Sequence, residues 1–249
     1  MKNYFSSKVL PTPIETAEML AKDFIRFTEE MKRFRENLYI ALSGGSTPNL
    51  LFDILAEEYP NAINWERLHF FWVDERCVPH SHIESNYGTA IQRCFSKVKI
   101  PKENLHPIMG GENTLEEVTR YTGEILSVVP YSAGYPAFDL ILLGMGDDGH
   151  TASIFPGQEH LFETNSIVAI AENPISGQKR ITLTGKVLNN SAEIVFMVTG
   201  NKKRNILYQI ITKDPLAINY PASKIAPIKG NLSWYVDLEA TGNLSTLVL

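Results

Sequence analysis

Cysteine, excess positive charge and long apolar runs are all scarce in this chain of 249 residues. The two cysteines, Cys77 and Cys94, accompany an N-terminal stretch with no signal-peptide pattern, so we expect free thiols and a cytoplasmic protein. No apolar run approaches the roughly 18 to 20 residues that cross a bilayer, which predicts no membrane partner. Lysine and arginine number 23 against 28 aspartates and glutamates, and the net charge of −5 argues against general binding of nucleic acid, which requires clustered cations.

The apolar content of 44% is enough to bury a large core, and it follows two periodicities. Helical spacing extends over residues 13–35, 50–59, 85–95 and 206–211. Short apolar runs predict strands at 38–43, 68–73, 138–143, 181–184, 193–199 and 232–238, and 101–113 and 129–137 are rich in loop-forming residues. Apolar strands that alternate with helices predict an α/β three-layer sandwich with a mainly parallel, Rossmann-like sheet. We expect one domain over residues 1–249, with a small subregion at about 151–185.

Polar clusters follow four of these strands, and in an open parallel sheet such strand ends line one ligand crevice. The first cluster is Ser43-Gly44-Gly45-Ser46-Thr47-Pro48. Its glycines permit close backbone approach, its hydroxyl side chains suit a helix cap, and its proline suits the first helical turn. Because the N–H groups at such a helix start bind anions, we predict phosphate binding by Gly44, Gly45, Ser46 and Thr47. A capped turn without a ligand is the alternative.

The second cluster, Gly144-Met145-Gly146-Asp147-Asp148-Gly149-His150, follows the most apolar strand. Its three glycines make a contorted loop that can hold N–H groups against a ligand. Histidine is the usual general base near neutral pH, and a nearby carboxylate orients the ring and stabilises its cation. We therefore predict His150 as a catalytic base assisted by Asp148. A purely structural histidine is the alternative.

Further charged residues follow other predicted strands. In Asp74-Glu75-Arg76, the guanidinium of Arg76 suits a bidentate contact with phosphate or carboxylate, and Asp74 suits the orientation of a hydroxyl or the transfer of a proton. Arg180 and Lys203 each lie at a strand edge and are candidate anion ligands in company with the two loops. A surface ion pair or a solvated cation is the alternative for these residues.

Several other chemistries lack their sequence signature. The chain has no Walker loop and no Gly-x-Gly-x-x-Gly fingerprint, which argues against a dinucleotide-binding oxidoreductase. His80 and His82 have no third ligand at a fitting spacing, so we expect no metal. Cys77 has only its arginine neighbour to activate it, and Ser153 does not lie in a Gly-x-Ser-x-Gly turn. We therefore expect neither an activated thiol nor a serine hydrolase.

Taken together, the two glycine-rich clusters, Asp74-Glu75-Arg76, Ser85-Asn86 and the continuation Thr151-Ala152-Ser153-Ile154-Phe155-Pro156-Gly157 closely resemble the 6-phosphogluconolactonase family, in the same order over nearly the whole chain. A wider group that includes glucosamine-6-phosphate deaminase shares the phosphate loop and the Asp-Gly-His turn. The deaminases carry a glutamate after that turn, where this chain has Phe155, and they have Asp-Glu-Tyr in place of Asp-Glu-Arg. Both differences favour the lactonase.

The resemblance implies hydrolysis of 6-phospho-D-glucono-1,5-lactone to 6-phospho-D-gluconate in the oxidative pentose phosphate pathway, without metal or cofactor. It implies a sugar-phosphate lactone as the partner, held by the backbone of residues 44–46, Arg76 and Lys203. His150 would take a proton from the attacking water, and N–H groups of a glycine-rich loop would stabilise the oxyanion. A sugar-phosphate isomerase or deaminase and a non-catalytic sugar-phosphate sensor are the alternatives, and the presence of His150 argues against the sensor.

Overall fold

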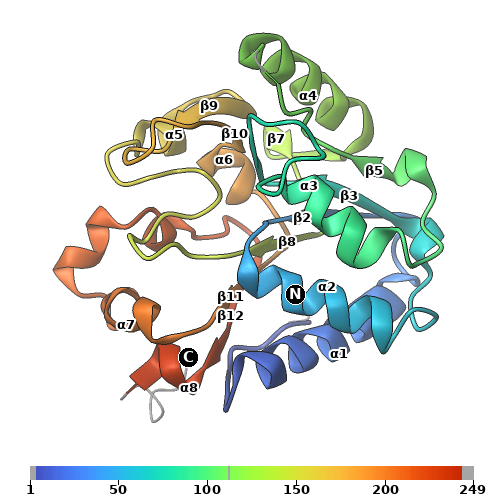
Figure 1. Cartoon of the computed structure of the whole chain (residues 1–249), viewed down its shortest axis with the longest axis horizontal. Helices are drawn as coiled ribbons and strands as arrows, with labels where there is room; N and C mark the ends of the chain where they lie inside the picture. The colour runs from blue at the N-terminus through green and yellow to red at the C-terminus, as the bar shows by residue number, and fades with distance from the viewer. Residues whose placement is uncertain (1–3, 112, 243–249) are drawn as a thin grey trace.

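A computed structural model describes residues 4–111 and 113–242, and a seven-stranded sheet forms its centre (Figure 1). The strands are β1 (Lys8–Leu10), β2 (Leu38–Leu42), β3 (Leu68–Trp72), β5 (Leu105–His106), β8 (Leu140–Leu143), β11 (Glu193–Val198) and β12 (Asn231–Asp237). They lie in the order β1-β12-β11-β8-β2-β3-β5, and every neighbouring pair is parallel. The predicted α/β fold with a mainly parallel sheet is therefore confirmed.

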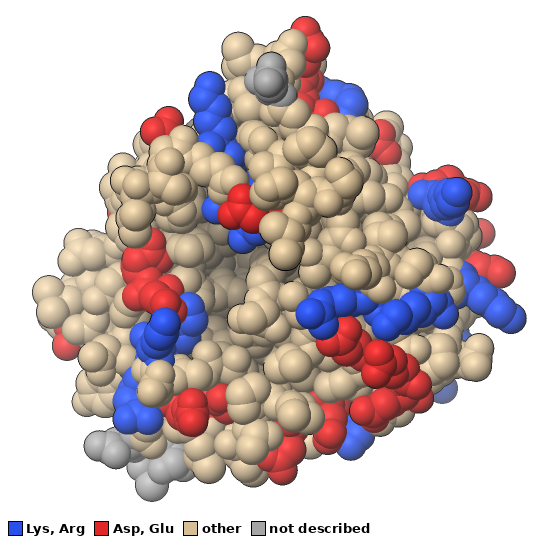
Figure 2. Space-filling view, viewed as in Figure 1, with Lys and Arg blue, Asp and Glu red and all other residues tan. Residues whose placement is uncertain are grey.

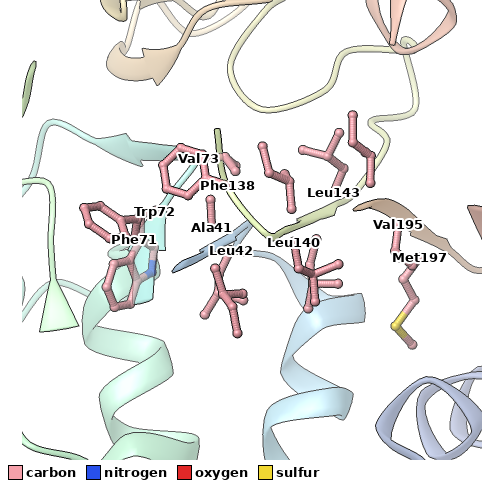
Figure 3. Packing of buried hydrophobic residues seen from close by; sticks show 14 of the residues in the cluster. Ala41, Leu42, Phe71, Trp72, Val73, Phe138, Leu140, Leu143, Val195 and Met197 are labelled. Carbon is pink, nitrogen blue, oxygen red and sulfur yellow. The ribbon is translucent and has the colours of Figure 1, made fainter. Parts of the chain in front are cut away.

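The inner strands are buried on both faces, which explains their continuous apolar runs. All four residues of β8 and all six of β11 are buried. Figure 3 shows how side chains of neighbouring strands pack above and below the sheet, among them Ala41, Leu42, Phe71, Trp72 and Leu140. Because successive side chains of a strand point to opposite faces, a strand covered on both sides has no polar alternation.

Helices cover both faces of the sheet. In Figure 1, one face carries α1 (Pro13–Met31), α2 (Ser46–Glu57) and α3 (Asn86–Ala90), and α3 is followed by the π-helical turn Ile91–Phe95. The other face carries α4 (Thr114–Val128) and α6 (Gly185–Leu188). The Thr12 hydroxyl caps α1 by accepting a hydrogen bond from the Glu15 N–H at 3.2 Å. α1 ends before residue 35, where it was predicted to end, because residues 32–35 offer only charged side chains and Phe34, which is 71% exposed.

The remaining helical elements of the described residues are short. They are α5 (His160–Glu163), α7 (Arg204–Ile211) and α8 (Leu238–Thr241), with 3₁₀ turns at Trp65–Arg67, Lys102–Asn104, Asn201–Lys203, Pro215–Asn219 and Pro221–Lys224. Across residues 4–111 and 113–242, no helix combines the length and the apolar character needed to cross a membrane.

A second sheet of three antiparallel strands lies beside the parallel one. It consists of β4 (Asp74–Arg76), β10 (Lys179–Leu183) and β9 (Val168–Glu172), in that order. The strand predicted at 181–184 is β10, so the prediction of a strand is confirmed, but it pairs outside the parallel sheet. β9 and β10 lie within residues 151–185, where the sequence leads us to expect a small subregion. The loop-rich stretch 129–137 contains a small hairpin of β6 (Tyr131–Ser132) and β7 (Tyr135–Pro136).

Several elements have no counterpart among the sequence-based expectations, among them β1, β5, β9 and α4. β1 and β5 have only three and two residues, which is too short for an apolar pattern. α4 does carry a pattern, because Val118, Tyr121 and Ile125 are spaced by three and four residues, and the last two are fully buried. This helix could therefore have been predicted from the sequence.

The strand order reverses between β2 and β8, which are neighbours in the middle of the sheet. β2 continues to β3 on one side, whereas β8 continues to β11 on the other. At such a switch point, the connections after the two strands leave in opposite directions and open a crevice at the carboxyl ends. The two glycine-rich loops follow β2 and β8, so the topology places them side by side.

Candidate active site

A cleft of about 600 Å³ opens at the carboxyl ends of β2, β3, β8 and β11. Figure 2 shows a hollow near the middle of this face, with lysine or arginine side chains at its rim. The cleft is lined by all ten residues that the sequence predicts for the site: Gly44, Gly45, Ser46, Thr47, Asp74, Arg76, Asp148, His150, Arg180 and Lys203. The structure therefore brings both glycine-rich loops and the three cations into one cavity.

The loop after β2 ends in the uncapped N-terminus of α2. Gly45 is the N-cap residue, with a φ of +113° that favours glycine, and no side chain accepts a hydrogen bond from the first turn. This corrects the expected capping by Ser46 and Thr47, which lie inside the helix. Thr47 instead shares a hydrogen bond of 3.1 Å with the Thr199 hydroxyl.

Free amides and a buried hydroxyl make this helix start suitable for an anion. The first N–H groups of an α-helix have no partner within the helix, and they carry the positive end of its dipole. Ser43, which precedes them, is 5% exposed, and its Oγ has no hydrogen-bond partner among the described residues. Both features fit a bound anion, since either donor would gain a partner there.

Gly44 fixes the position of this loop against α3. A Cβ on Gly44 would lie 1.9 Å from Asn86 Oδ1, so only glycine fits. Asn86 is buried and donates from Nδ2 to the Asp74 carbonyl at 2.9 Å. Asn86 therefore packs between the strand β4 and the glycine-rich loop after β2, a role that the sequence analysis did not assign to it, although Ser85-Asn86 was among the matching motifs.

The loop after β8 holds His150 against Asp148. His150 Nδ1 lies 2.5 Å from Asp148 Oδ1, and the same oxygen accepts the His150 N–H at 3.0 Å. A Cβ on Gly146 would lie 2.1 Å from His150 Nδ1, so the pair requires glycine there. Gly149, with a φ of +82°, allows the close approach of Tyr220 from the other side.

The contact with Asp148 determines the chemistry of the His150 ring. Burial acts to raise the pKa of Asp148, but the hydrogen bond and the charge of His150 outweigh burial, and the pKa lies below its usual value. An ionised Asp148 accepts the proton of Nδ1, which leaves Nε2 as the ring nitrogen with a free lone pair. The Phe155 ring packs at 4.7 Å from the His150 ring. The His150 ring is thus held in one orientation by Asp148 and has an apolar neighbour.

Two N–H groups of this loop are already used within it. Gly146 N donates to the His150 carbonyl at 2.8 Å, and Gly149 N donates to the Gly146 carbonyl at 3.1 Å. These bonds hold the loop in its contorted shape. The expected oxyanion donors therefore do not include these two amides in the observed conformation.

Two arginines of the antiparallel sheet face each other in the cleft. Arg76 on β4 and Arg180 on β10 are direct cross-strand partners. Burial, and then the charge of Arg76, lower the pKa of Arg180. The Nε atoms of both residues are buried without a partner among the described residues. Two adjacent cations with unused donors are a favourable site for an anion with more than one negative charge.

Two carboxylates support this wall of the cleft. Asp74 is 6% exposed, and its Oδ2 accepts a hydrogen bond from Ser153 Oγ at 2.5 Å. Glu75 is fully buried and accepts hydrogen bonds from Ser85 Oγ and from the N–H groups of Asn86 and Tyr87. Burial raises the pKa of Glu75, and these hydrogen bonds partly offset the effect. Glu75 thus anchors the start of α3, while Asp74 faces the cleft.

Lys203 stands apart from the two arginines because it has a carboxylate partner. It ends the 3₁₀ turn after β11 and forms an ion pair with Asp147 of the loop after β8. His80 and His82, for which the sequence predicts no metal, do not line the cleft, and His80 Nε2 lies 2.8 Å from the Ile108 carbonyl oxygen. Among the residues described, no group of three or more histidine, cysteine, aspartate or glutamate side chains is arranged to hold a metal ion.

The fold and the cleft define a class of α/β protein in which a glycine-rich helix start and an aspartate–histidine pair meet at the switch point of a parallel sheet. The chain belongs to the family described as glucosamine-6-phosphate isomerases/6-phosphogluconolactonase, whose model matches residues 11–234. The resemblance noted from the motifs is therefore confirmed.

Individual relatives agree over almost the whole chain. A 6-phosphogluconolactonase of Haemophilus influenzae is 41% identical over 239 residues, which cover 96% of this chain and 98% of that protein. A solved structure described as the devB protein is 40% identical with a TM-score of 0.90 and covers 96% of this chain and 99% of the other. The solved 6-phosphogluconolactonase of Trypanosoma cruzi is 29% identical with a TM-score of 0.84 and covers 98% of both chains.

Proposed function

We propose that this chain hydrolyses 6-phospho-D-glucono-1,5-lactone to 6-phospho-D-gluconate in the oxidative pentose phosphate pathway, with His150 as the general base. The observation that carries the proposal is that His150, oriented by Asp148 at 2.5 Å, lines the same cleft as the uncapped N-terminus of α2. The start of α2 suits an anion, and His150 suits proton transfer. A phosphorylated lactone presents both requirements in one molecule.

In this proposal, the phosphate is held by the loop after β2 (residues 43–48), here named the anion loop, and by the cations around it. The first-turn amides of Ser46 and Thr47 and the positive end of α2 contribute from one side. Arg180, Lys203 and Arg76 contribute from the others, and all three line the cleft. Asp74, also on the cleft wall, accepts a hydrogen bond from a sugar hydroxyl and so orients the ring.

The chemical step uses one proton carrier. Nε2 of His150 removes a proton from water as its oxygen attacks the lactone carbonyl carbon, and Asp148 stabilises the resulting imidazolium. The tetrahedral intermediate carries a negative charge that the cationic cleft stabilises. When the bond between the carbonyl carbon and the ring oxygen breaks, His150 returns the proton to that oxygen. The products are the open-chain acid and the unprotonated histidine, so no other reactant is required.

Phe155 favours hydrolysis over the deamination catalysed by other members of the group. Its ring lies 4.7 Å from that of His150, at the position where the resemblance places the glutamate of the deaminases. Phe155 is 2% exposed, and a phenyl ring neither accepts nor donates a proton. The deaminase reaction is therefore the less favoured candidate.

The test is a coupled assay with freshly generated lactone, in which the rate of 6-phosphogluconate formation is compared with spontaneous hydrolysis. We expect His150→Ala to lower kcat at least about 100-fold with little change in KM, the usual size of a general-base effect. Arg76→Ala should mainly raise KM. Near-normal kcat for His150→Ala would remove this base from the mechanism, and release of ammonia from glucosamine 6-phosphate by the wild type would establish the deaminase instead.

A further inference from the structure

The ion pair between Lys203 and Asp147 joins two loops across the cleft. Lys203 follows β11, and Asp147 belongs to the loop that carries Asp148 and His150. The Lys203 side chain is 20% exposed and that of Asp147 is 57% exposed, and both residues line the cleft. A lysine placed to receive an anionic ligand is therefore already bound to an anion of the protein itself.

The other two cations of the cleft, Arg76 and Arg180, have no such carboxylate partner among the described residues. Arg76 donates to the Glu84 carbonyl, which is uncharged, at 2.5 Å. The Nε atoms of Arg76 and Arg180 have no partner within the described residues. A phosphate that reaches the arginines gains hydrogen bonds without displacing a charged group. A phosphate that reaches Lys203 meets the Asp147 carboxylate beside it.

Electrostatics then places Asp147 in competition with the ligand. The lysine ammonium has three donors, so it can contact both anions, but the carboxylate and the phosphate then lie close together and repel each other. Asp147 is more than half exposed, so its side chain is free to turn toward solvent when a ligand enters. Asp148 has its own partner, so this movement does not require the His150 pair to break.

We propose that Asp147 is an internal competitor that occupies Lys203 in the free enzyme and is displaced by the phosphate group of the ligand. The inference rests on the proposed function, since the ligand is taken to be a phosphorylated lactone. Asp147 weakens the binding of substrate and of product alike, because both carry the same phosphate. Its effect on the enzyme is faster release of a product that would otherwise be held by three cations.

The test compares Asp147→Asn with the wild type by the binding of inorganic phosphate, measured by calorimetry, and by KM for the lactone. We expect the variant to bind phosphate about two- to fivefold more tightly and to lower KM by a similar factor, as befits a partly exposed ion pair. The difference should shrink at about 0.5 M salt, where charge interactions are screened.

The matched control is Glu29→Gln, which removes one carboxylate from the exposed Glu29–Lys32 pair on α1 and changes the net charge equally. It should leave phosphate binding unaltered. Weaker phosphate binding by Asp147→Asn would mean that Asp147 positions Lys203 for the ligand. Unchanged binding would mean that Asp147 does not compete with phosphate for Lys203. Either result overturns the proposal. If Asp147→Asn binds phosphate more tightly than the wild type but the wild type does not hydrolyse the lactone, only the proposed function is refuted.

Discussion

Replacement of Gly146 by alanine tests the catalytic pair without altering either of its members. A Cβ at this position would lie 2.1 Å from His150 Nδ1 and 2.6 Å from Asp148 Oδ1. A Cβ atom essentially never lies closer than 3.0 Å to another heavy atom. The His150 ring must therefore move by about 0.9 Å to lengthen the contact with Nδ1 from 2.1 Å to 3.0 Å. Gly146 has no positive φ, so its backbone accepts alanine and the strain falls on the contact itself.

The displacement sets the expected magnitude. A misplacement of about 1 Å in a reacting group lowers the rate about 100-fold, which corresponds to about 2.7 kcal/mol of transition-state stabilisation. We expect kcat of Gly146→Ala to fall by about this factor. KM should stay within about threefold of the wild-type value, since the anion loop and the cations lie on other elements.

Gly144→Ala is the matched control, because it lies two residues earlier in the same loop and its added Cβ has no heavy atom within 4 Å. Both variants are assayed for kcat by the formation of 6-phosphogluconate and for folding by thermal unfolding. A kcat for Gly146→Ala close to that of Gly144→Ala, with both variants folded, would refute the argument that the position of the His150 ring governs the reaction.

Two further predictions concern the anion loop and the core. Gly44→Ala would place a Cβ 1.9 Å from Asn86 Oδ1, and because the Asp74 carbonyl holds Asn86 in place, the loop must shift. We expect KM for the lactone to rise about tenfold or more, which corresponds to a loss of about 1.4 kcal/mol of binding free energy. A KM equal to that of the wild type would contradict this prediction. Burial raises the pKa of Glu193 to about 7, so the folded state favours the protonated carboxyl, and its contribution to stability is present at low pH and lost as the pH rises through about 7. The unfolding free energy of Glu193→Gln relative to wild type should therefore increase by about 2.5 kcal/mol between pH 5 and pH 8. Urea titrations at the two pH values measure this difference, and a constant difference would show that Glu193 does not titrate as described.

Local features of the sequence were sufficient for much of the fold and for the membership of the site. The apolar runs of β2, β3, β8 and β11 identify buried strands, and a general rule of parallel sheets places the polar residues after them at one edge. For this reason the residues predicted for the site line a single cleft. The very short strands β1 and β5 escaped prediction because two or three residues do not make a pattern.

The antiparallel sheet illustrates what local patterns do not contain. Arg76 and Arg180 are more than one hundred residues apart, and they become neighbours only because β4 pairs with β10. Ser153 reaches Asp74 across 79 residues of chain. Each of these residues is polar or charged, and its place in the sequence alone does not distinguish it from an ordinary surface residue. Their shared role depends on how the second sheet packs against the first.

By itself, the sequence determined the class of the fold, the family and the candidate base, because these depend on apolar periodicity and on contiguous motifs. Only the tertiary structure decided that Gly44 and Gly146 have no room for a Cβ, that α2 begins without a cap, and that Lys203 is occupied by Asp147. The physical reason is that room, hydrogen-bond partners and ion pairs are properties of side chains from separate elements, and packing alone brings those elements together.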